Sequence, residues 1–160
     1  MINVKRGSIP VPSIDAAYMI DKTTGYVKLN KFTENSYEEF MEAMENLQKQ
    51  GLKELIYDLR GNGGGYMNEA IEMADEFLDG DKLVVYTEGV HTKKKEYRCK
   101  RPGLFEKGKL VILIDELSAS ASEVLAGALQ DWDRAIIVGR RSFGKGLVQE
   151  QYQLSDGSAL

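Results

Sequence analysis

Three short segments of this sequence carry residue types that can perform nucleophilic chemistry. Residues 58–65 end in Gly-Asn-Gly-Gly-Gly, and such a run lets backbone N–H groups turn toward a bound anion. Residues 118–123 read Ser-Ala-Ser-Ala-Ser-Glu, which places Ser120 at the start of an expected helix, beside free backbone N–H groups. Residues 139–146 place Lys145 between two glycines, so this segment offers a basic side chain.

Two of these segments resemble nucleotide-binding loops without matching them. Asn68 stands where a dinucleotide fingerprint would need its third glycine, and a tight flexible turn remains an alternative for the glycine run. Residues 139–146 nearly fit the phosphate loop, but Gly146 replaces the hydroxyl residue that would hold magnesium. Residues 147–152 then predict a strand, so no helix N-terminus would face a phosphate. The sequence therefore argues against a nucleotide cofactor.

Ser120 also has a purely structural interpretation, because Ser120 and Glu123 fit a helix-capping box. As a nucleophile it would need a base. The one histidine, His91, lies in a polar, lysine-rich stretch typical of an exposed loop. Lys145 is the alternative base, and it would have to be neutral, which requires an apolar setting. If the chain from Lys145 is extended, Gln149 lies on the same face and could hold the amine without adding charge.

The elements that must position these segments alternate between strands and helices. A capping box at Ser36 and a terminal glycine at Gly51 bound the first expected helix. The runs at 111–114 and 135–138 are apolar enough to be strands buried on both faces. Further strands are expected at 17–20, 26–29, 55–57, 83–87, 96–100 and 147–154, and further helices at 70–78 and 121–132. This alternation predicts a layered α/β domain with a largely parallel sheet.

Composition limits the class of protein. A chain of 160 residues predicts one domain, and a net charge of −4 argues against nucleic acid as a partner. Cys99 is the one cysteine, so neither an internal disulfide nor a cysteine-based zinc site can form. No stretch approaches the roughly 18 apolar residues of a membrane-spanning helix. The lysines at 93–95 predict the solvated edge of a strand or hairpin.

Taken together, residues 58–65, 118–131 and 143–149 resemble the C-terminal processing, or tail-specific, serine proteases in order, spacing and setting. The resemblance covers roughly residues 15–160. It implies that Ser120 is the nucleophile, that Lys145 is the general base and that Gln149 holds this lysine. It also implies an oxyanion hole, formed by the backbone N–H groups of Ala121 and of one glycine. Gly65 is the preferred glycine, and Gly64 is the alternative. Gly63 departs from the family pattern, where proline is frequent.

The same resemblance implies a fold like that of the Clp protease subunit and the crotonases. Residues 15–160 would be the protease core, cut short at its C-terminal end, and residues 1–14 would be a linker leaving a PDZ domain in cis. The implied substrates are proteins or peptides with disordered, apolar C-terminal tails, and no cofactor or metal is needed. The implied location is the bacterial cell envelope or periplasm, and a homo-oligomer is compatible with the family.

Two other functions remain open on these residues. One is a non-catalytic module that holds a peptide or another apolar ligand on the same fold. The other is a crotonase-like enzyme that acts on acyl thioesters with the same pair of backbone amides. The second would need an adenine-nucleotide pocket, of which the sequence carries no sign.

Overall fold

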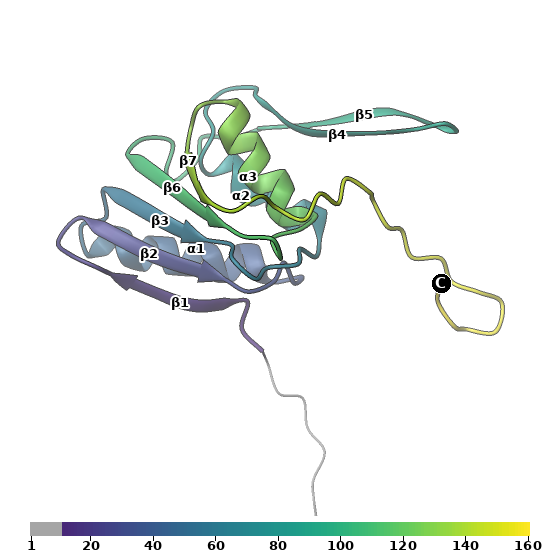
Figure 1. Ribbon diagram of the computed structural model, residues 1–160, viewed down its shortest axis with the longest axis horizontal. Helices are drawn as coiled ribbons and strands as arrows, with labels where there is room; N and C mark the ends of the chain where they lie inside the picture. Colours follow the sequence, from purple (N-terminus) through teal and green to yellow (C-terminus); the bar gives the residue numbers. More distant parts are fainter. Residues whose placement is uncertain (1–10) are drawn as a thin grey trace, which may run out of the picture.

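Strands and helices alternate along residues 11–160, the part of the chain that this computed structural model describes (Figure 1). A five-stranded sheet has the order β1-β2-β3-β6-β7, and β4 and β5 form a separate two-stranded hairpin. The strands are β1 Ile14–Met19, β2 Thr24–Leu29, β3 Glu54–Asp58, β4 Leu83–Gly89, β5 Thr92–Arg98, β6 Lys109–Ile114 and β7 Ile136–Gly139. The helices are α1 Ser36–Lys49, α2 Met67–Asp75 and α3 Ala121–Asp131.

The large sheet is parallel except at its first strand. Neighbouring strands from β2 through β7 run parallel, whereas β1 runs antiparallel to β2. Parallel neighbours need a crossover connection, and α1, α2 and α3 lie in the three crossovers. The predicted layered α/β domain with a mostly parallel sheet is confirmed.

One face of the sheet packs against the helices. Val27, Tyr57 and Ile112 are neighbours on adjacent strands and are fully buried. The ring of Phe40 from α1 lies 5.4 Å from that of Tyr57, and the ring of Phe77, just after α2, lies 6.1 Å from it. Burial of each such side chain contributes about 1.5–3 kcal/mol. This packing anchors β3 and β6, whose carboxyl ends lead into two of the candidate segments.

The opposite face of the sheet is partly exposed, so the expectation that residues 111–114 and 135–138 are buried on both faces is wrong. In β6 full burial falls on Leu110 and Ile112 alone, and in β7 Ile136 is 67% exposed. An all-apolar run does not reveal which faces of a strand are covered, because that depends on the elements packed against the sheet.

β4 and β5 form a hairpin that projects away from the large sheet (Figure 1). The lysines at 93–95 are all exposed on β5, as predicted for a solvated edge. The ammonium groups of Lys94 and Lys95 lie over the rings of Tyr86 and Tyr97, at 4.5 and 4.7 Å from the ring centroids. The hairpin is thus a polar ribbon in which lysine ammonium groups lie over tyrosine rings.

The segment at 140–160 is extended and carries one isolated bridge, between Gln153 and Ala159. The strand expected over 147–154 is therefore wrong for this structure. A strand needs a hydrogen-bonding neighbour, and no strand of the described part of the chain pairs with these residues. Figure 1 shows the segment leaving the sheet.

The expected linker at 1–14 falls largely outside the described residues, and β1 begins at Ile14. The helix expected over 70–78 is α2, which begins and ends earlier. Phe77 and Leu78 follow it as buried residues of a turn. Across residues 11–160, the helices are too short or too polar to cross a lipid bilayer.

Candidate active site

Ser120 is the residue that precedes α3, and its backbone has an unusual conformation. Its φ of 55° and ψ of −113° lie outside the regions that residues other than glycine normally adopt. Such strain costs about 1–3 kcal/mol and persists only where the surroundings hold it. Of the predicted capping box, one half is present: the Ser120 N–H donates to the Glu123 carboxylate at 2.8 Å. The Ser120 hydroxyl makes no side-chain cap hydrogen bond.

The serines on either side of Ser120 have a different environment. Ser118 and Ser122 are fully buried. Their hydroxyls donate hydrogen bonds to the carbonyls of Leu59 and Asn62, at 2.8 and 2.9 Å. These bonds attach the start of α3 to the loop after β3. The outer serines therefore build the turn, while the middle serine, half-buried, lines a cavity.

Gly64 packs directly against the Ser120 turn. A Cβ at Gly64 would lie 2.7 Å from the carbonyl oxygen of Ala119 and 2.9 Å from Cβ of Ser120, and the φ of Gly64 is 95°. Both the space and the backbone angle therefore require glycine here. The third neighbour of that Cβ position is the backbone nitrogen of Ala121, at 3.0 Å. The glycine run thus reaches the N-terminus of α3.

The loop that presents these glycines is held by Asn62, a residue that the sequence reasoning passed over. Its buried side chain accepts a hydrogen bond from the Gly64 N–H at 2.9 Å and donates one to the carbonyl of Leu29 at 3.0 Å. An asparagine among four glycines was the available signal, because a glycine-rich turn needs a side chain to fix it.

Two backbone N–H groups of residues that line the cavity of Ser120 remain without an acceptor in residues 11–160. They belong to Gly65 and Ala121, whereas the N–H of Gly64 is taken by Asn62. The Ala121 N–H is free because the first turn of a helix has no intrahelical partner for it. The N–H groups of Gly65 and Ala121 are the two that the resemblance implies for an oxyanion hole, and both residues line the same cavity as Ser120.

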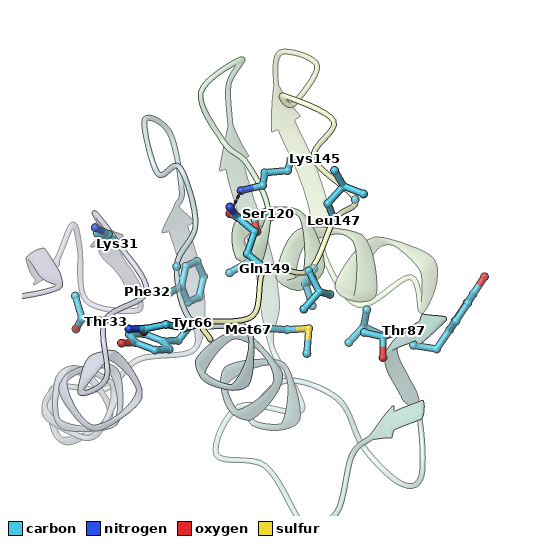
Figure 2. A pocket seen from close by; sticks show the side chains of 18 residues that line it. Lys31, Phe32, Thr33, Tyr66, Met67, Thr87, Ser120, Lys145, Leu147 and Gln149 are labelled. Carbon is cyan, nitrogen blue, oxygen red and sulfur yellow. Dashed lines mark hydrogen bonds between the residues drawn. The ribbon is translucent and has the colours of Figure 1, made fainter. Parts of the chain in front are cut away.

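Lys145 and Gln149 also meet in space. The Nζ atom of Lys145 donates a hydrogen bond to Oε1 of Gln149 at 2.6 Å (Figure 2). Lys145 is half-buried, and it lines the same cavity as Ser120. In the described chain no hydrogen bond joins Lys145 to Ser120. The structure therefore brings both side chains to one cavity without a hydrogen bond between them.

Glu123 is a second residue whose importance the sequence analysis understated, because it was considered only as a helix cap. Its carboxylate accepts hydrogen bonds from the backbone N–H groups of Ser120, Gly144 and Lys145 and from the hydroxyl of Ser142, at 2.7–2.9 Å. Partial burial raises the pKa of this carboxyl, but the hydrogen bonds outweigh burial and lower it. Glu123 is thus ionised and joins α3 to the loop that carries Lys145.

The cavity beside Ser120 has a volume of about 720 Å³ and is largely apolar (Figure 2). Its apolar lining comes from the loop after β2, from α2, β4 and α3, and from the extended segment after Lys145. It includes Phe32, Met67, Val85, Val124, Leu147 and Val148. An apolar cavity with a few convergent polar groups is the usual form of a substrate site.

Other candidate groups lie elsewhere. His91 is exposed in the hairpin turn and lines neither cavity that contains Ser120, so a serine–histidine pair has no support. After β7, no helix follows residues 139–146, which agrees with the argument against a phosphate loop. Across residues 11–160, no three His, Cys, Asp or Glu side chains gather in a metal-binding arrangement.

Residues 23–160 match the protein-family model described as Peptidase family S41. The chain belongs to this family. As an S41 sequence it is 39% identical over 146 residues to a carboxyl-terminal-processing protease of Picosynechococcus sp., covering 85% of this chain and 32% of that protein. It is 38% identical over 161 residues to a probable CtpA-like serine protease of Staphylococcus epidermidis, covering 99% of this chain and 32% of that protein.

Solved structures agree with the S41 assignment. A photosystem II D1 C-terminal processing protease superposes with a TM-score of 0.75 at 38% identity, covering 85% of this chain and 35% of that one. A putative S41 protease from Bacteroides fragilis superposes with a TM-score of 0.76 at 16% identity, covering 93% and 44%, which supports the fold alone. The expected relationship to C-terminal processing serine proteases is confirmed. The S41 chain spans about a third of the length of the curated relatives that it matches.

Proposed function

We propose that this S41 chain is the core of a serine endopeptidase in which Ser120 is the nucleophile and Lys145 the general base. One observation carries the proposal. Ser120 and Lys145 line a single cavity, and so do Gly65 and Ala121, whose backbone N–H groups lack acceptors within residues 11–160. This arrangement offers a nucleophile, a base and an oxyanion site at one place.

The reaction would be acyl transfer. Neutral Lys145 takes the hydroxyl proton of Ser120 as the oxygen attacks the peptide carbonyl. The N–H groups of Gly65 and Ala121 hold the resulting oxyanion, and in comparable sites one such donor is worth roughly 10²–10³ in kcat. The protonated lysine then gives its proton to the leaving amine as the C–N bond breaks. Water, deprotonated by the same lysine, releases the acyl group from Ser120.

Lys145 would have to turn from Gln149 toward Ser120 for the first proton transfer. The side chain of lysine is a flexible four-carbon stem, so rotation about its bonds reorients Nζ. Gln149 presents an uncharged oxygen to Nζ, and a neutral acceptor stabilises the ammonium less than a carboxylate would. The observed bond is therefore compatible with a base that must lose its proton.

The substrates we propose are disordered, apolar C-terminal tails of proteins. The largely apolar lining beside Ser120 supports this, as do the relatives named for carboxyl-terminal processing. By the same relationship we propose a parent chain with a PDZ domain, acting in the bacterial cell envelope. A homo-oligomer is compatible with this proposal.

Cleavage of a protein with a disordered apolar tail tests the proposal. Wild type, Ser120→Ala and Lys145→Met are incubated with the substrate, and the products are identified by mass spectrometry. We expect tail cleavage by the wild type alone, with both variants folded by circular dichroism. Equal cleavage by wild type and Ser120→Ala would show that Ser120 is not the nucleophile.

A binding module is the second candidate, and one observation favours it: Lys145 is bonded to Gln149 and not to Ser120. It predicts tail binding without turnover, with an affinity that Ser120→Ala leaves unchanged. Cleavage lost in the Ser120→Ala variant would exclude this candidate.

A further inference from the structure

A second groove leads away from Ser120 along α3. It has a volume of about 470 Å³ and starts at Ser120 and Lys145, which also line the first cavity. Along the helix it is lined by Ser120, Glu123, Val124, Gly127, Ala128, Asp131 and Trp132. These positions recur every three or four residues, so one continuous face of α3 forms the floor. The groove therefore extends from the candidate nucleophile to the end of the helix.

The opposite wall of the groove is the free edge of β4. β4 has a single hydrogen-bonded strand neighbour, β5, among residues 11–160. Its other edge faces α3, because the carbonyl of Leu83 accepts a hydrogen bond from Nε1 of Trp132 at 2.8 Å. A free strand edge presents unpaired main-chain N–H and C=O groups, which bind an extended peptide by strand addition.

The middle of the groove is open because its helix residues are small. A Cβ at Gly127 would meet no atom within 4 Å, and Ala128 follows it. Gly127 costs an exposed helix roughly 0.8–1.0 kcal/mol relative to alanine. Space for an extended chain is a function that would justify this cost.

The far end of the groove carries an unpaired negative charge. Of the charged residues that line it, Glu123 is occupied by its four hydrogen bonds and Lys145 by Gln149. Asp131 is exposed and forms no ion pair or side-chain hydrogen bond with the described residues. A basic side chain is therefore the partner that this end of the groove fits.

We propose that the α3–β4 groove holds the substrate chain on one side of the scissile bond, and that Asp131 selects a basic residue four or five positions from that bond. The inference rests on the proposed function. Asp131 lies eleven residues after Ser120, which is about 16 Å along a helix. An extended chain covers that distance in about five residues.

Trp132, the single tryptophan of the chain, gives a readout that does not depend on catalysis. Tail peptides are prepared with Lys, Ala or Glu at the fourth and fifth positions on each side of the bond cleaved by the wild type. Binding to intact Ser120→Ala protein is followed by Trp132 fluorescence. We expect a change in fluorescence, and on one side two- to fivefold tighter binding of the Lys peptide than of the Glu peptide, the range of an exposed ion pair.

Substitutions then test the residues. Asp131→Lys should invert the preference for the Lys peptide over the Glu peptide. Asp133 is an exposed aspartate outside the groove, so Asp133→Asn should preserve that preference. Gly127→Phe should fill the groove and weaken binding at least tenfold, while Gln130→Phe, on an exposed position of α3 outside the groove, should not. Binding with the same preference in Asp131→Lys, or unaffected by Gly127→Phe, would overturn the proposal.

The two proposals fail separately. If the wild type cleaves no tail, the protease function fails, and a lysine scan of one tail peptide against Ser120→Ala protein still tests the groove. The groove proposal alone is wrong if the wild type cleaves tails, but peptides leave Trp132 fluorescence unchanged and the Lys and Glu peptides bind with equal affinity.

Discussion

The carboxylate of Glu123 accepts a hydrogen bond from the backbone N–H of Lys145 at 2.9 Å, across 22 residues of sequence. The same carboxylate accepts the backbone N–H of Ser120 at 2.8 Å. One side chain therefore fixes where the two candidate catalytic residues lie relative to each other. Its effect on activity should exceed that of an ordinary helix cap.

Glu123→Gln tests this role. The amide keeps the shape but has one acceptor oxygen in place of two, so at least one of the loop N–H groups loses its partner. We expect kcat/KM to fall at least tenfold, and the free energy of unfolding to fall by about 1–2 kcal/mol. Glu116→Gln, an exposed glutamate paired with Arg140, serves as the control and should change neither.

Low pH should remove the contribution of Glu123 to the free energy of unfolding. Because the pKa of Glu123 is lowered in the folded protein, its stabilisation is complete above the usual range of a glutamate and is lost as the pH falls below it. The difference in free energy of unfolding between wild type and Glu123→Gln should be largest at neutral pH. Denaturant titrations across the acid range measure it, and a difference that grows on acidification would contradict the assignment.

Gly64 and Gly63 form a matched pair within the glycine run. Gly64→Ala places a Cβ against Ala119 and Ser120 at a φ of 95°, and should cost about 2–4 kcal/mol and abolish cleavage. A Cβ at Gly63 meets nothing within 4 Å, and its φ is not in the left-handed region. Gly63→Ala should therefore be neutral or stabilise by about 0.4–1 kcal/mol. Thermal unfolding and tail cleavage of both variants check the pair.

Gln149→Glu should move the pH dependence of cleavage. A carboxylate at the position of the Gln149 amide would stabilise the protonated form of Lys145, so deprotonation would need higher pH. We expect the rise of kcat/KM with pH to shift upward by about one unit or more. Gln153→Glu, exposed and outside the two cavities that contain Ser120, is the control and should leave the profile in place.

Asp58 should carry part of the acid sensitivity of the fold. Burial raises its pKa, but hydrogen bonds from Arg60 and Tyr26 outweigh burial and lower it to about 2. Its stabilisation is therefore complete above the usual pKa of an aspartate and is lost as the pH falls through about 2. Asp58→Asn should cost about 1–3 kcal/mol at neutral pH and flatten the acid dependence of stability. The exposed Asp15→Asn should do neither.

The sequence by itself determined the class of fold and the three segments that converge. Apolar strands between amphipathic helices predict parallel β/α units, and residues that follow β3 and β6 must then meet at one edge of the sheet. The proximity of the glycine run to the Ser120 turn follows from that topology. The contact between Lys145 and Gln149 was predicted from strand periodicity, although the segment is extended without being a strand.

Tertiary structure decided which polar groups remain free. The three serines of residues 118–122 are alike in sequence, yet Ser118 and Ser122 bond to the loop after β3 while Ser120 lines the cavity. No local sequence pattern predicts that Glu123 bonds to the loop of Lys145, and none predicts that Ile136 is exposed. Hydrogen bonding and burial depend on neighbours distant in the chain, and the identity of those neighbours is set by packing rather than by local periodicity.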